Sequence, residues 1–312
     1  CHLLKMSLRQ YATTEELQEL LDRETEGEKR ELPENNLLEN TLKLAISSEF
    51  TATNLEVYGY PDASPQCYFF VEYSDVQCPL IIVRNPLFGP DLSLLKEAIP
   101  LVVAKLSDLL AKHNTLLMSG DEATSDEFER HISSLPGTPF QTVPFLSSTG
   151  VFYMTQTQRE QLLKEKLDAP EGFTFERADA DRDAETIHRL WKTALDLEVT
   201  KNRLRFLPSA CARTESGELA GWAMTSRIGE VTNLYVLPEY RNRGLGKALE
   251  LSVAKQFASR GMRVLKYVET TNTAVYEGSL RSPLWTLWTT EGSDEEKSPM
   301  LHSLRKFVRR SD

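Results

Sequence analysis

The sequence predicts an α/β (α+β) protein made of two halves, each a mixed, mostly antiparallel sheet flanked by helices. The chain has 312 residues, about twice the size of a common single domain. In both halves, apolar runs of strand length are interspersed with runs that repeat at helical spacing. Hydrophobic residues make up 40% of the chain and charged residues 26%, which is typical of a globular protein with a sizeable core.

The first half, residues 1–165, is predicted to be a domain without a catalytic motif. A Thr cap and early glutamates start a first helix, Pro33 precedes a second, and Pro100 interrupts a third. Turn-forming residues such as those in PDASPQ separate three β-like runs. The expected helices are 13–24, 32–48, 91–113 and 124–135, and the expected strands are 53–60, 67–74 and 79–86. A helical connector at 155–172 places the domain boundary near residue 165.

The second half, residues 166–292, begins with an alternating strand and an amphipathic helix and continues mainly with strands. The ESGE turn joins two of these strands as a hairpin. The expected strands are 173–178, 208–214, 219–227, 230–238, 262–269 and 283–291, and the expected helices are 181–195, 244–261 and 271–280. Residues 293–312 are predicted to be a charged, solvated tail with a short terminal helix.

Composition excludes several classes of function. A net charge of −10 argues against a general nucleic-acid binder, because neutralising phosphates requires a basic face. No apolar run approaches the ~18 residues of a membrane span. The four cysteines form no CxxC pair and no zinc spacing, so we expect no metal and reduced thiols, although Cys67 and Cys78 could pair. We expect an intracellular protein, either cytoplasmic or, since residues 1–14 lack acids and carry two basic residues, mitochondrial.

The stretch LYVLPEYRNRGLGKAL, residues 234–249, joins a strand to a helix through a glycine-containing turn. A helix N-terminus offers unpaired N–H groups and a partial positive charge, and glycine lets an anion approach the backbone. Arg241, Arg243 and Lys247 add positive charge there. The turn is not a Walker loop, and Leu249 stands where a dinucleotide fingerprint has its third glycine. It therefore predicts an anion site of another kind.

The order of three strands, RxxGxG, helix and strand resembles the GNAT superfamily of acyl-CoA N-acyltransferases. Within it, the chain is similar to the glycine N-acyltransferase-like family, in which a Cys, a Trp, a Gly-Glu and a Pro-Glu-Tyr-Arg recur at the spacings of Cys211, Trp222, 229–230 and 238–241. LWTLW resembles the Trp-rich last strand of that family. The resemblance implies two GNAT-like halves, with only the second binding an acyl-CoA or acetyl-CoA co-substrate. It implies acyl transfer to glycine or another small amino acid.

The resemblance also implies roles for particular residues. The fourth strand, with Leu234, Tyr235 and Val236, would lie along the pantetheine arm. The following turn would hold the pyrophosphate through Arg241, Arg243, Gly244, Leu245, Gly246 and Lys247. Asn272 would contact the coenzyme, although a helix cap is an equal alternative. Glu230 would be the general base, with a pKa raised by partial burial. Glu239 is a weaker candidate for the general base, and we expect its side chain to face solvent.

The sequence departs from the resemblance at several positions. Many GNAT enzymes protonate the leaving thiolate with a tyrosine, but Leu280 occupies that place and Tyr276 lies one turn earlier. The sequence also differs from the glycine family at residues 222–227 and at Gly246. These differences weaken the assignment of glycine itself as the acceptor. The acceptor's carboxylate has no assigned partner, and Arg205, Arg213 and Arg227 all remain open. We expect Trp222, Trp285 and Trp288 in the core, a buried unreactive Cys211, and His188 at the surface or core edge.

Two other functions remain open at this point. One is an acetyl-CoA-dependent acetyltransferase for a peptide or protein amine, which an open groove would support. The other is a non-catalytic acyl-CoA-binding protein whose first half docks a partner. We expect a monomer or weak homo-oligomer whose main partner is a small-molecule amine acceptor.

Overall fold

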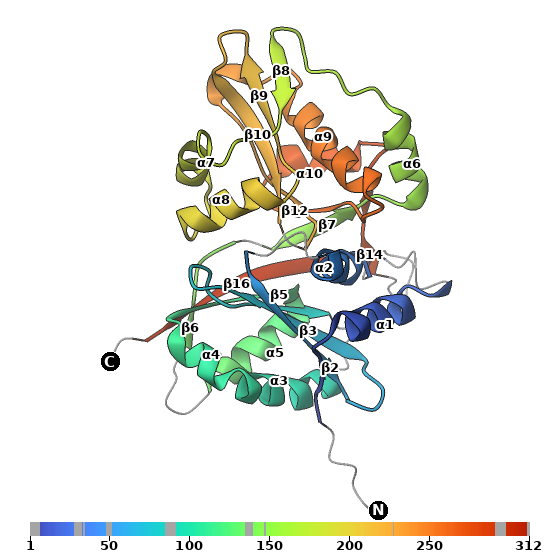
Figure 1. Cartoon of the computed structure of the whole chain (residues 1–312), viewed down its shortest axis with the longest axis vertical. Coiled ribbons are helices and arrows are strands. Elements are labelled where there is room, and N and C mark those ends of the chain that lie inside the picture. Colours follow the sequence, from blue (N-terminus) through green and yellow to red (C-terminus); the bar gives the residue numbers. More distant parts are fainter. Residues whose placement is uncertain are drawn as a thin grey trace, which may run out of the picture.

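The computed structural model describes residues 7–27, 33, 35–47, 52–84, 92–134, 140–146, 148–226, 228–290 and 298–310. Two α/β halves lie one above the other, and strands of both meet in the middle of the molecule (Figure 1). Each half has mostly antiparallel strands flanked by helices, as the sequence predicts.

The first half contains most of one large sheet and five helices within the described ranges. Its strands are β1 (Arg9–Tyr11), β2 (Asn54–Tyr60), β3 (Cys67–Tyr73), β4 (Leu80–Arg84), β5 (Thr115–Asp121), β6 (Phe140–Val143) and β7 (Thr149–Tyr153). Its helices are α1 (Thr14–Glu24), α2 (Asn35–Ser47), α3 (Ser93–Lys105), α4 (Ser107–Lys112) and α5 (Glu122–Ser133). Thr13 caps α1 in a capping box with Glu16, as its sequence indicates.

The second half follows α6 (Gln156–Lys164), and the boundary predicted near residue 165 stays a prediction. Its strands are β8 (Phe173–Glu176), β9 (Ala210–Thr214), β10 (Leu219–Thr225), β11 (Val231–Val236), β12 (Leu265–Glu269), β13 (Thr286–Leu287), β14 (Thr289–Thr290), β15 (Ser298–Pro299) and β16 (Leu301–Arg309). Its helices are α7 (Ala184–Leu190), α8 (Leu197–Phe206), α9 (Leu245–Ser259) and α10 (Thr273–Leu280), with a 3-10 turn at Pro238–Tyr240.

The two halves exchange strands. The order of the large sheet is β1-β2-β3-β4-β5-β16-β7-β12, so β16 from the chain's end lies beside β5 of the first half (Figure 1). Conversely, β7 of the first half pairs antiparallel with β12 of the second. Strands β8 to β11 form a separate four-stranded sheet of order β11-β10-β9-β8. Parts of each half are therefore completed by the other.

The prediction of a solvated tail with a terminal helix is wrong for residues 301–309. Strand β16 pairs with β5 from His302 opposite Asp121 to Val308 opposite Thr115, and Phe307 is fully buried. One of the basic residues that suggested a tail has partners, since Arg305 forms ion pairs with Asp126 and Glu129 of α5. Strands β1, β5, β6 and β7 are also absent from the prediction, and the expected helix 181–195 is shorter, with α8 following it.

Candidate active site

The turn before α9 has the geometry of an anion site. Gly244 adopts a left-handed conformation with φ +79°, and Asn242 does the same with φ +61°. The first backbone hydrogen bond of the helix joins the N–H of Ala248 to the carbonyl of Gly244 at 3.2 Å. The N–H groups at 245–247 precede that bond, so they remain available to a ligand.

The basic residues of this turn are exposed, and two of them rest on aromatic rings. The Nε of Arg241 donates to the carbonyl of Val236 at 3.0 Å, and its guanidinium lies 5.4 Å from the centre of the Tyr235 ring. Arg243 lies 5.9 Å from the centre of the Phe173 ring. These contacts hold both cations beside the helix N-terminus. The side chain of Leu245 is buried, so only its backbone faces the turn.

A cleft opens where β11 and β12 diverge. A register shift between Trp222 and Met224 of β10 lies opposite Asn233 of β11, which has φ +46°. Between β11 and β12, the described residues show one ladder contact, a parallel bridge of Glu230 with Leu265. Past that bridge lies a cavity of about 380 Å³ whose lining includes Leu234, Tyr235, Val268 and Asn272. The cleft therefore runs between two strands, as a long flexible ligand arm requires.

Glu230 lies at the inner end of this cleft and is partly buried. Burial raises the pKa of its carboxyl to about 7, while the positive charge of Arg203 and a hydrogen bond with the Thr232 side chain oppose that rise. The raised pKa fits a group that exchanges protons near neutrality. Glu239 is exposed in the 3-10 turn, as expected.

A second cavity, of about 120 Å³, adjoins the first, and Glu230 and Trp191 line both. Its wall comes from both halves, with Arg203 from α8 and Glu72 from β3. Sequence reasoning assigned no site role to Arg203, Glu72 or Trp191. Trp191 is the C-cap residue that follows α7, and it lines both cavities. No local motif marks these residues, because the fold brings them together from distant segments.

The turn that carries Glu230 is held by the first half of the chain. The side chain of Asn40, on α2, donates to the carbonyls of Arg263 at 2.9 Å and Gly229 at 3.4 Å. It also accepts from the N–H of Arg263 at 2.8 Å. Gly229 has φ +76°, and a Cβ there would lie 2.1 Å from the Asn40 amide nitrogen. Glycine is therefore required by both the backbone conformation and the close approach of Asn40.

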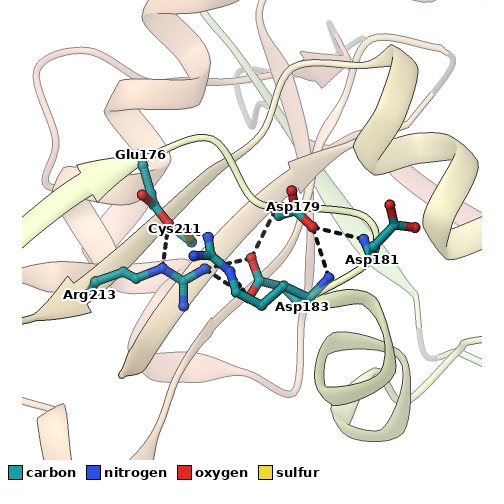
Figure 2. Close-up of polar contacts among 7 residues, drawn as sticks. Glu176, Asp179, Asp181, Asp183, Cys211 and Arg213 are labelled. Atoms are coloured by element: carbon teal, nitrogen blue, oxygen red, sulfur yellow. Dashed lines mark hydrogen bonds and ion pairs between the residues drawn. The ribbon is translucent and has the colours of Figure 1, made fainter. Parts of the chain in front are cut away.

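The arginines considered for the acceptor's carboxylate lie elsewhere or outside the described ranges. Figure 2 shows the guanidinium of Arg213 between Glu176 and Asp183, with the Asp183 oxygens 2.7 and 2.8 Å from its Nη2. Arg205 is exposed and forms an ion pair with Asp181 at 3.1 Å. Arg227 lies outside the described residues.

The remaining singled-out side chains are mostly structural. Trp222 is fully buried against the Tyr235 ring at 5.1 Å, and Trp285 donates to Glu250 at 2.7 Å, so both belong to the core as expected. Tyr276 packs against Phe152 with ring centres 5.2 Å apart. Burial raises the pKa of the Cys211 thiol to about 12, which keeps it protonated and unreactive.

Tyr267 and His302 pack face to face beside Glu230, with ring centres 4.4 Å apart. Burial and the charge of Glu230 raise the pKa of Tyr267 well above its usual value, so this phenol stays protonated. Burial lowers the pKa of His302 to about 3, so the imidazole stays neutral. The surroundings of Glu230 therefore hold two neutral rings and one nearby cation, Arg203.

Cys67, Cys78 and Cys211 are free thiols, and Cys1 lies outside the described residues. In the described part of the chain, no three His, Cys, Asp or Glu side chains gather as a metal site would require. None of the helices within the ranges given above combines the length and hydropathy of a bilayer crossing.

The comparisons with known proteins agree with this geometry. A family model described as FR47-like protein matches residues 210–277, which span β9 to α10. A solved Drosophila protein superimposes with a TM-score of 0.67 at 18% identity, over 97% of this chain and 98% of that one. A GCN5-related N-acetyltransferase from Sphaerobacter thermophilus has a TM-score of 0.51 at 12% identity, over 98% and 97%. The fold is thus that of two GNAT-like domains.

Proposed function

We propose that this protein is an N-acyltransferase that moves an acyl group from acyl-CoA to the amine of a small amino acid. The observation that carries the proposal is the position of Glu230, which lines both cavities and whose carboxyl pKa is raised to about 7, as a proton acceptor would require. The cleft between β11 and β12 would take the thioester arm, and the smaller cavity would take the acceptor. The fold and the similarity to glycine N-acyltransferase-like proteins support the same reaction class.

The cleft residues fit coenzyme A as a co-substrate. The N–H groups at 245–247 and the cations Arg241, Arg243 and Lys247 would hold the pyrophosphate, since each offers positive charge or a donor. Leu234, Tyr235 and Val236 would lie along the pantetheine arm, and Asn272 lines the same cavity. No metal takes part in the mechanism that we propose.

The reaction follows from these positions. The acceptor amine attacks the thioester carbonyl carbon while Glu230 takes a proton from its nitrogen, directly or through water. The edge of β11 that faces β12 offers backbone N–H groups to the developing oxyanion. Collapse of the intermediate breaks the C–S bond and releases the thiolate. Tyr276 packs against Phe152, whereas Tyr267 and Tyr235 line the cleft.

The size of the second cavity favours a small acceptor over a peptide. Its volume of about 120 Å³ corresponds to a few water-sized groups, and both halves of the protein wall it. A non-catalytic acyl-CoA-binding protein would have no need for a proton acceptor with a pKa near 7 at this position.

The test is thiol release from acetyl-CoA and benzoyl-CoA with a panel of amino acids, for the wild type, Glu230→Gln and the exposed control Glu239→Gln. We expect acceptor-dependent release that falls at least tenfold in Glu230→Gln alone, with coenzyme A binding unchanged by calorimetry. Coenzyme A binding without release for any amino acid would refute the proposed acceptor class. Equal activity of Glu230→Gln and wild type would refute the role of the base.

A further inference from the structure

The second cavity contains an arginine whose charge is not neutralised by a neighbour. In the ranges that the structure describes, the Arg203 guanidinium forms no ion pair or hydrogen bond, and its central carbon lies 5.0 Å from the centre of the Trp191 ring. Burial lowers its pKa, and the charges of Glu72 and Glu230 oppose this. By contrast, the buried Arg213 and the partly buried Arg305 each contact two carboxylates.

This arrangement is unfavourable without a ligand. A guanidinium withdrawn from water loses hydration, and pairing with a carboxylate through two parallel hydrogen bonds would restore that loss. The face of Trp191 fixes the plane of the guanidinium and leaves its N–H edge for such a contact. The cavity also carries negative charge from Glu72, which is 3% exposed. One cation and three carboxyl groups, those of Glu72, Asp196 and Glu230, line this small space, which therefore complements a zwitterion.

We propose that Arg203 binds the carboxylate of the acceptor and thereby places its amine at Glu230, so that the protein selects amines with an adjacent carboxylate. This inference rests on the proposed function and adds the residue that would select the acceptor. Glu72 lines the same cavity from the first half. The GNAT-like half without a catalytic motif thus forms part of the acceptor site.

The test compares amino acids with their amides, such as glycine with glycinamide, in the wild type, Arg203→Gln, Arg203→Lys and Arg205→Gln. Arg205 lies on the same helix, is exposed and serves as the matched control. Rates are compared at pH 9, where the Glu230 carboxyl is ionised in every variant. For amino acids, we expect Arg203→Gln to lower kcat/KM at least tenfold, mainly through KM, and Arg203→Lys to recover part of that loss. For amides, the rate should change less than threefold.

A second readout separates carboxylate binding from an indirect effect on the base. Because the charge of Arg203 lowers the pKa of Glu230, its removal should move the acidic limb of kcat/KM to higher pH for both kinds of acceptor. The other titratable side chains that line the two cavities are unchanged in this comparison: Glu72, Lys192, Asp196, Tyr235, Glu250, Lys266, Tyr267, Glu269 and His302. Arg205→Gln should show neither effect.

The outcomes distinguish the two proposals. If the wild type uses amides and amino acids equally well, or Arg203→Gln lowers both equally at pH 9, acyl transfer stands and the carboxylate assignment is refuted. If neither kind of acceptor stimulates thiol release by the wild type, the proposed function fails first.

Discussion

Asn40 of α2 should control both the stability of the molecule and the position of Glu230. Its amide makes two hydrogen bonds with the backbone of Arg263, at 2.8 and 2.9 Å, and Asn40 is fully buried. Truncation in Asn40→Ala deprives a buried N–H and a buried carbonyl of this partner, at about 1–3 kcal/mol each. We therefore expect Asn40→Ala to lower the free energy of unfolding by about 2–4 kcal/mol, with the longer contact to Gly229 adding little.

The same contact predicts a coupling with Gly229. In Gly229→Ala, the new Cβ would lie 2.1 Å from the Asn40 amide, so that side chain must move and lose its hydrogen bonds. A left-handed alanine adds roughly 1–2 kcal/mol of strain. With Asn40→Ala already present, there are no side-chain hydrogen bonds left to lose, and the strain remains together with a close contact of 2.8 Å between the Cβ atoms of residues 229 and 40. The double variant should therefore be more stable than the sum of the single variants predicts, by about 2–4 kcal/mol on the estimate for the hydrogen bonds.

The assay is urea unfolding at pH 7 for the wild type, Asn40→Ala, Gly229→Ala and the double variant. The kcat/KM of the same four proteins is also measured. The turn at 226–230 carries Glu230, so we expect Asn40→Ala to lower kcat/KM at least fivefold with unchanged coenzyme A binding. Thr41→Val on the same helix is the control, because its buried hydroxyl has no partner in the described part of the chain and its loss should not destabilise. If the changes in the free energy of unfolding of the two single variants add up in the double variant, the reasoning is refuted. A loss of stability in Asn40→Ala without a loss of kcat/KM would refute it as well.

Three further predictions concern the base, the anion turn and the last strand. In the wild type, kcat/KM should rise as the pH increases through about 7, the pKa of Glu230, and Glu230→Gln should lose this limb. Since that pKa is raised from 4.5 on folding, the contribution of Glu230 to stability falls between pH 4.5 and 7, and Glu230→Gln should melt higher than wild type at pH 8 but not at pH 4. Gly244→Ala should weaken coenzyme A binding in calorimetry, because residue 244 has a φ of +79° that alanine adopts only with strain. Gly246→Ala should bind coenzyme A nearly normally, because its new Cβ would make only an ordinary contact at 3.8 Å. Equal losses of affinity in the two variants would contradict this prediction. Phe307→Ala removes a fully buried side chain of β16 and should destabilise by about 3–5 kcal/mol in urea unfolding; an unchanged midpoint would show that this side chain is dispensable.

The features that the sequence predicts well are local ones. Thr13 and Glu16 lie in one helical turn, and the capping box follows from them directly. The glycine turn before α9 is also local, because a left-handed residue at 244 and free helix N–H groups follow from a few neighbouring residues. Glu230 as the base comes from the resemblance and stays a prediction, and its elevated pKa fits the expected burial.

The features that the sequence does not predict depend on contacts between distant segments. Arg203 looks like an ordinary exposed helix residue until Trp191 and Glu72 are placed beside it. Strand β16 resembles a charged tail because its partners, β5 and the carboxylates of α5, are almost 200 residues earlier. Neither periodicity nor capping reports such pairings, since both describe only neighbouring residues.

These contacts explain why a half without a catalytic motif can matter for the reaction. Strand β7 of the first half continues the sheet beside β12, which forms one wall of the cleft. Asn40 fixes the turn before Glu230, and Glu72 closes the cavity in which Arg203 lies. In the proposed reaction, the second half would therefore supply the turn for the pyrophosphate and the base, while the first half would set the position of that base and form the far wall of the acceptor cavity. Differences in acceptor choice among proteins of this fold are then expected to follow substitutions in β3 and α8 rather than in the glycine turn.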